Sequence, residues 1–183
     1  MGLIDFLIHV AKFTVATVFL VAAMGKAVPA NSFRLFRISL RSYGLTDSHI
    51  ASAAAIGLIA LESMLAVTLS VDSLGLTREA FVLTALSLSL FTLLAGHAHK
   101  ETSGLRCNCF GPRGREFGLF HIVRNAGLIV VSILCAFYLY RHDTLPNLHT
   151  GDEYLLAITL GISVGISMLL PDLGSPHLDP KVQ

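Results

Sequence analysis

The sequence predicts an all-α integral membrane protein, a four-helix transmembrane bundle with an interfacial amphipathic helix and a short fifth span. Of the 183 residues, 54% are hydrophobic and only 14% are charged, whereas a soluble domain carries about 25% charged residues. The mean hydropathy is +0.70. The apolar residues also gather in long runs, and about 20 such residues are enough to cross a bilayer as a helix.

Four of these runs are long enough to span and hold few polar interruptions. Two lysines and a histidine interrupt the first run, Glu62 is the single charge of the second, and the fourth contains Arg124 and Asn125. Asp5 and the absence of a basic residue before the first run argue against a cleaved signal peptide. We therefore expect all four runs to be spans. They cover residues 7–28, 50–71, 80–98 and 117–140.

A fifth apolar run covers residues 154–170 and is near the lower limit for a span. We expect it to stop at Pro171, because proline does not continue a helix. Gly161 and Gly165 have the spacing that lets two helix backbones approach closely in lipid. The predicted organisation is a four-helix membrane domain over residues 1–150, followed by an additional short span and a polar tail over residues 151–183.

Residues 31–49, between the first two spans, mix large apolar side chains with three arginines. Arg34, Arg37 and Arg41 are spaced i, i+3 and i+7, which places them on one face of a helix. Gly44 follows as a helix-ending residue. The pattern predicts an amphipathic helix on the membrane surface, with the arginines facing lipid phosphates.

The charged residues inside the runs need partners, because an unpaired carboxylate in a bilayer is costly. Glu62 lies near the middle of its run, and we expect it to pair with Lys26 or with Arg124. Arg124 and Asn125 are expected to face the bundle interior. Such a pair either orients the helices or supports a functional loop or a proton route.

Residues 106–118, between the third and fourth spans, read RCNCFGPRGREFG and contain two of the three cysteines. A disulfide between Cys107 and Cys109 would close a small, strained ring, and strain makes such a bond prone to exchange. Arg106, Arg113 and Arg115 favour the thiolate form, which is the nucleophile. The stretch therefore favours a redox-active pair, which would make the protein a thiol–disulfide oxidoreductase.

Two other readings of the cysteines stay open. With His97, His99 and His121, the thiolates would suit copper or zinc, although the arginines repel cations and the spacing matches no standard zinc module. We expect no metal site. The thiols could also be inert, as we expect for Cys135, a core cysteine remote from the pair.

Several motifs together resemble the MauE family of methylamine utilisation membrane proteins, which belong with the DoxX-like four-helix membrane proteins. In order, they are GKAV at the end of the first span, FRLFRISLRSYGL, ALESMLAV, CNCFG and IVRN. The resemblance covers roughly residues 10–140. It implies a four-helix core and a role in disulfide metabolism outside the cytoplasm, with Cys107 and Cys109 as the exchanging pair. Glu62, Arg124 and Asn125 match polar positions of the family pattern.

The resemblance also implies a thioredoxin-like partner or a disulfide-containing client. Electrons could pass onward to a quinone held between helices, although the sequence shows no quinone motif. A different class of function is a non-catalytic subunit of a larger membrane complex, in which Gly161 and Gly165 would pack against partner proteins. The formal net charge of +1 gives no electrostatic case for nucleic acid.

The expected location is the cell (inner) membrane, and two arguments disagree on which side the cysteine loop faces. If the spans alternate, the loops after the first and third spans lie on one side and hold most of the basic residues. The positive-inside rule places that side in the cytoplasm, where thiols are kept reduced. The family resemblance places it outside, and we expect an extracytoplasmic loop.

Overall fold

A computed structural model of the chain describes residues 3–28, 30–42, 44–71, 75–101, 119–142 and 151–173. These residues form six helices and no strand. In chain order the helices are α1 (Leu3–Ala27), α2 (Ala30–Ser42), α3 (Ser48–Ser70), α4 (Thr77–Glu101), α5 (Leu119–His142) and α6 (Gly151–Leu173). The all-helical class is as predicted. Cys107 and Cys109 lie outside the described residues.

Five of the helices are long and apolar enough to cross a membrane: α1, α3, α4, α5 and α6. Their outer faces carry large apolar side chains, such as Leu86, Leu93 and Leu134, which are 61%, 71% and 62% exposed. In water such a surface would aggregate, whereas lipid solvates it. The chain is therefore a multi-pass membrane protein.

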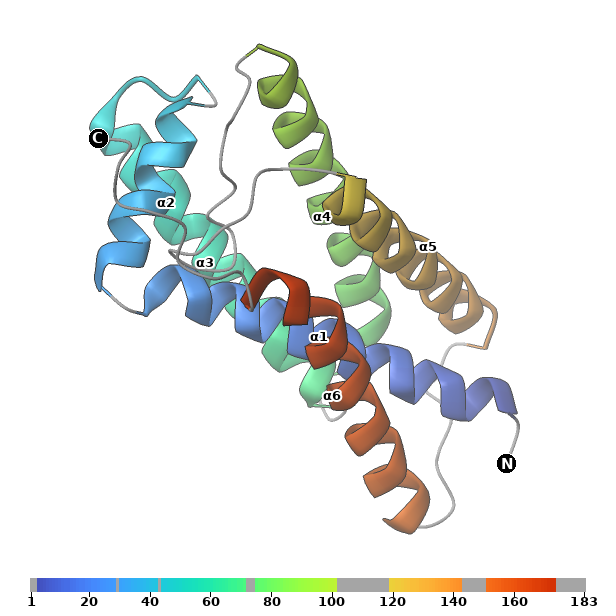
Figure 1. Ribbon diagram of the computed structural model, residues 1–183. Helices are drawn as coiled ribbons and strands as arrows, with labels where there is room; N and C mark the ends of the chain where they lie inside the picture. The colour runs from blue at the N-terminus through green and yellow to red at the C-terminus, as the bar shows by residue number, and fades with distance from the viewer. Residues whose placement is uncertain are drawn as a thin grey trace.

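Helix α1 lies at the centre of the bundle. Of its span, 61% is buried, against 22–33% for the other four. It contacts α2, α3, α5 and α6, and Figure 1 shows it running through the middle of the molecule. Val15, Phe19, Leu65 and Leu128 belong to one apolar cluster that joins α1, α3 and α5. The remaining helices are thus placed by their packing on α1 or on each other.

Helix α2 buries one face and exposes the other. Phe36 and Leu40 are buried against Ala55 of α3, while Arg34 and Arg41 are exposed. The helix ends before Gly44, whose φ of 100° is accessible mainly to glycine. The predicted amphipathic pattern is present, and its apolar side packs on the protein.

Helix α3 begins after an N-cap. The Asp47 side chain accepts hydrogen bonds from the backbone N–H of His49 and of Ile50, at 2.7 and 3.2 Å. These bonds satisfy two of the donors that a helix start leaves unpaired. The start of the second span is therefore determined by local hydrogen bonding.

The fifth span is longer than predicted. Helix α6 has 23 residues and continues past Pro171 to Leu173, so the expectation of a stop at that proline is wrong. A proline in the last turn loses one backbone hydrogen bond, and its φ remains compatible with a helix. At 1.5 Å per residue, 23 residues extend about 35 Å, enough to cross a bilayer.

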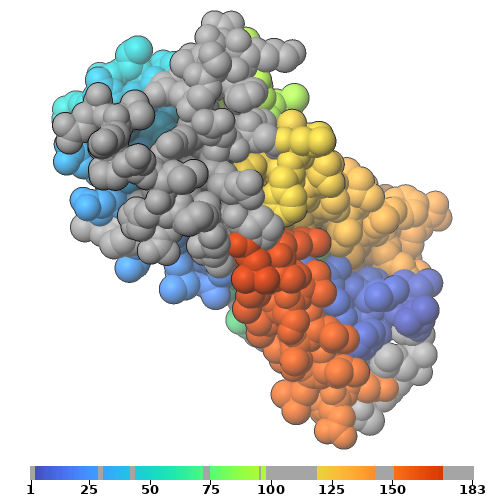
Figure 2. Space-filling model, in the orientation of Figure 1, coloured from blue at the N-terminus to red at the C-terminus, as the bar shows by residue number. Residues whose placement is uncertain are grey.

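Helix α6 packs closely on α1 through its two small residues, and Figure 2 shows its orange and red surface beside the blue surface of α1. A Cβ added at Gly161 would lie 2.5 Å from the Phe13 Cβ, and one added at Gly165 would lie 2.9 Å from the Thr17 Cβ. The Thr14 hydroxyl donates to the Gly161 carbonyl at 3.2 Å. The close-approach prediction is confirmed, but the contact lies within the chain. The idea that these glycines pack against partner proteins is wrong.

Replacing Gly161 with alanine should weaken the contact between α6 and α1. The new methyl group would also come within 2.9 Å of the Val10 carbonyl oxygen, so backbone must shift. We expect a loss of about 1–3 kcal/mol, typical of overpacking, measured as heat unfolding of the detergent-solubilised protein by circular dichroism. Gly127→Ala, on α5 with open space around the new group, is the matched control. Equal unfolding midpoints for the two variants would contradict the contact.

Candidate functional site

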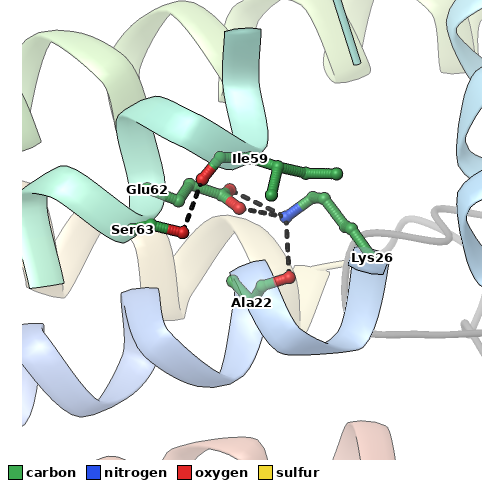
Figure 3. A network of polar contacts seen from close by, with 5 residues as sticks. All are labelled: Ala22, Lys26, Ile59, Glu62 and Ser63. Atoms are coloured by element: carbon green, nitrogen blue, oxygen red, sulfur yellow. Dashed lines mark hydrogen bonds and ion pairs between the residues drawn. The ribbon is translucent and has the colours of Figure 1, made fainter. Parts of the chain in front are cut away.

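The candidate site is built around an ion pair between α1 and α3. The Lys26 ammonium lies 2.7 Å from Glu62 Oε1 and 2.8 Å from Oε2, and it also donates to the Ala22 carbonyl at 3.2 Å. The side chains are 2% and 13% exposed. Figure 3 shows Lys26 reaching from the end of α1 to the carboxylate on α3. Of the two partners expected for Glu62, the structure has Lys26.

The groups around the Lys26 ammonium satisfy its hydrogen-bond donors and its charge. An ammonium group has three N–H donors and no acceptor, and three oxygens receive hydrogen bonds from Lys26. The Phe36 ring of α2 lies 5.4 Å from the ammonium nitrogen, within the range of a cation–π contact. Three helices of the N-terminal half, α1, α2 and α3, therefore meet at, or directly beside, this charge.

Arg124 and Asn125 complete the polar cluster from α5. They are 7% and 4% exposed, so both face the bundle interior as expected. The Asn125 amide donates to the Thr92 hydroxyl of α4 at 3.0 Å. Arg124 is the fifth residue after Leu119, about 7.5 Å along the helix. This places it near the end of α5 to which residues 102–118 are joined.

These side chains line one cleft among four spans. The space in the cleft that a water-sized sphere can occupy measures about 50 Å³. Most of its lining is apolar, and its polar groups come from all four of the helices that form it. The lining residues are Val18, Phe19, Ala22, Lys26, Leu58, Leu61, Glu62, Ser87, Leu88, Phe91, Arg124 and Asn125.

Alternation of the spans places the polar end of the cleft on the side where α4 ends and α5 begins. Helix α4 runs toward residues 102–118 and α5 runs away from them, so the C-terminal end of α4 and the N-terminal end of α5 share a side. The end of α1, which carries Lys26, lies on that side as well. The structure thus brings together four predicted site residues, Lys26, Glu62, Arg124 and Asn125. Cys107 and Cys109, the other two predicted site residues, lie outside the described residues.

The histidines and the third cysteine are placed as follows. His121 is buried at 6%, His97 is exposed, and the side chain of His99 is not among those described. Cys135 is 6% exposed within the central apolar cluster, as expected for a core cysteine. Within the described residues, no three His, Cys, Asp or Glu side chains lie close enough together to hold a metal ion.

A second polar group on α1 was not anticipated. Lys12 and His9 are 0% and 3% exposed. The Lys12 ammonium lies 4.5 Å from the centre of the Phe13 ring and 5.9 Å from that of Tyr154 on α6. Asp5, at the start of the same helix, accepts a hydrogen bond from the Tyr138 hydroxyl of α5 at 2.9 Å. The sequence pattern does indicate this group, because Asp5, His9 and Lys12 are spaced i, i+4 and i+7 and so lie on one face of the helix.

Five helices long enough to span a membrane, packed around buried charged side chains, make this chain a multi-pass helical membrane protein. The chain belongs to the MauE family. The family model described as methylamine utilisation protein MauE matches residues 4–138, which cover α2 to α4 and nearly all of α1 and α5, whereas α6 lies beyond the match. No curated protein and no solved structure matches the chain significantly.

Removing one member of the Lys26–Glu62 pair should destabilise the bundle. Glu62→Gln leaves the Lys26 charge buried without its carboxylate, and breaking a buried pair in this way costs about 3–5 kcal/mol. We expect a lower unfolding midpoint in detergent for Glu62→Gln, and substantial recovery in Lys26→Met/Glu62→Leu. Glu79→Gln breaks the exposed pair with Arg78 and should change little. Equal effects of the two glutamine variants would contradict a structural role for the buried pair.

Proposed function

We propose that this protein acts in disulfide metabolism, exchanging thiol and disulfide through Cys107 and Cys109 with a thioredoxin-like partner or a disulfide-containing client. Membership of the MauE family supports a membrane role. The observation that carries the proposal is the position of the buried polar cluster. Arg124 and Asn125 lie in the second turn of α5, the helix that follows the Cys-x-Cys segment in the chain, and Asn125 is bonded to Thr92 on α4, the helix that precedes it. The two helices that flank the cysteines are therefore held together.

The exchange proceeds through a mixed disulfide. A thiolate of the pair attacks one sulfur of the partner's disulfide, forming an intermolecular S–S bond and releasing the partner's other sulfur as a thiolate. The second cysteine then attacks the mixed disulfide, which closes the Cys107–Cys109 bond and releases the reduced partner. The reverse sequence oxidises the partner. Arginines on either side of the pair favour the thiolate in both directions.

The charged cluster has a supporting role in this proposal. Lys26 and Glu62 hold α1 against α3, and Asn125 holds α5 against α4. Together they set the positions of the four helix ends on the side where residues 102–118 begin and end. A strained dithiol segment can store its strain only if the elements at its two ends resist movement.

Single cysteine substitutions should trap the mixed disulfide. With Cys107→Ser or Cys109→Ser, the remaining thiol can form the intermolecular bond but no second thiol resolves it. We expect at least one variant to accumulate a covalent adduct in cells, detected by non-reducing electrophoresis and mass spectrometry after rapid alkylation. Cys135→Ala is the control, because that thiol is buried in the core. Full activity of Cys107→Ser/Cys109→Ser in client oxidation would rule out the redox role.

We also propose that the protein lies in the cell (inner) membrane with the Cys-x-Cys segment outside the cytoplasm. Disulfides persist in oxidising compartments, and the positive-inside rule alone would favour the opposite orientation. One of the arginines behind that rule is engaged with the protein, since Arg37 donates to the Ser52 hydroxyl of α3 at 3.4 Å.

Thiol labelling tests this orientation. In a Cys135→Ala background, a membrane-impermeant maleimide should modify Cys107 and Cys109 in intact cells after mild reduction. The modification is counted by mass spectrometry, and the same reagent applied after lysis gives the full extent. Protection in intact cells together with labelling after lysis would place the segment in the cytoplasm.

A further inference from the structure

The cleft has a chemical polarity that restricts its occupant. One part of the wall is apolar, formed by residues such as Phe19, Leu61, Leu88 and Phe91 from three spans. The other part holds the ion pair and the Arg124 and Asn125 side chains. The occupant is therefore an amphiphile with an apolar body and a small polar head.

The polar end favours a head group that accepts hydrogen bonds. With its side chains ionised, the end carries two positive charges, Lys26 and Arg124, and one negative charge, Glu62. The three donors of Lys26 are directed at Ala22 and Glu62, so the donors for a ligand come from α5. Arg124 has five N–H groups in a planar fork, and the Asn125 amide has a second N–H besides the one given to Thr92. Carbonyl and carboxylate oxygens both suit this end.

The choice between a carbonyl head group and a carboxylate head group follows from redox chemistry, and it rests on the proposed function. We propose that the cleft among α1, α3, α4 and α5 binds a lipid-soluble quinone, which takes the electrons from the Cys107–Cys109 dithiol. The two S–H bonds break and one S–S bond forms between the sulfurs. The released electron pair and two protons convert the two quinone carbonyls to hydroxyls, giving the hydroquinone. A long-chain carboxylate would bind the same donors but accepts no electrons.

The experiment uses full-length protein in lipid nanodiscs and an azido-benzoquinone with a ten-carbon tail as photoaffinity probe. Cross-linked peptides are quantified by mass spectrometry, with decylubiquinone and palmitate as separate competitors. We expect labelling of the cleft helices that decylubiquinone suppresses and palmitate does not. The Cys107→Ser/Cys109→Ser variant should label like the wild type, because binding precedes and does not need the thiols.

Two serines on α4 provide a matched pair of variants. Ser87 lines the cleft, whereas Ser89, two residues further on, is not part of its lining. Ser87→Leu fills space in the cleft and should reduce specific labelling by about tenfold or more, and Ser89→Leu should leave it unchanged. Arg124→Gln should also reduce labelling about tenfold, the effect of losing one charge-assisted hydrogen bond. Arg124 is buried, so Arg124→Gln could lose labelling because the protein misfolds. In that case the comparison of Ser87→Leu with Ser89→Leu tests the quinone site.

Reduction of decylubiquinone by the reduced protein, followed anaerobically by ultraviolet absorbance, separates the two proposals. Labelling that Ser87→Leu does not change, or that only palmitate suppresses, would overturn the quinone site even if Cys107 and Cys109 exchange with a partner. Specific labelling without any thiol-dependent quinone reduction would overturn the electron transfer step and leave the binding site in place. Loss of reduction in both Ser87→Leu and the double cysteine variant is the result that we expect.

Discussion

The arrangement of this bundle depends on the ion pair between Lys26 and Glu62. A single charge inside a bilayer is costly, and the pair is tolerable because the ammonium meets both carboxylate oxygens and one backbone carbonyl. The bond can form only when the end of α1 lies beside the middle of α3. It therefore sets the register between the central helix and its neighbour, and it forms one wall of the cleft.

The remaining polar contacts extend that arrangement to the other helices. Asn125 joins α5 to α4 through Thr92, and Tyr138 joins α5 to α1 through Asp5. Helix α6 adds a close backbone contact through Gly161 and covers Lys12 with Tyr154. The family match ends at residue 138, yet α6 belongs to the same packed unit. The proposed quinone site has Lys26 and Arg124 in its lining, and two of the helices that form it, α4 and α5, precede and follow the proposed dithiol segment in the chain.

Much of this could be predicted from sequence, because span formation depends on local hydropathy. The runs of apolar residues identified all five long helices. Glu62, Arg124 and Asn125 were recognised as inward-facing because charged and polar side chains are costly when they face lipid. Other features could not be predicted. Nothing in the apolar run around Thr92 indicates a partner for its hydroxyl, which accepts a hydrogen bond from Asn125 on another helix. The rule that proline ends a helix failed at Pro171, where only the last turn is affected.

The sequence by itself determined that the chain is a helical membrane protein, where its spans lie, which residues needed a partner, and that a Cys-x-Cys joins two spans. These are properties of composition and short-range spacing. Only the tertiary structure decided that Glu62 binds Lys26 and that Gly161 packs within the chain. It alone shows that four helices enclose a cleft with one polar end. Those outcomes depend on contacts between residues far apart in the chain, which form only when the helices dock and bury them together.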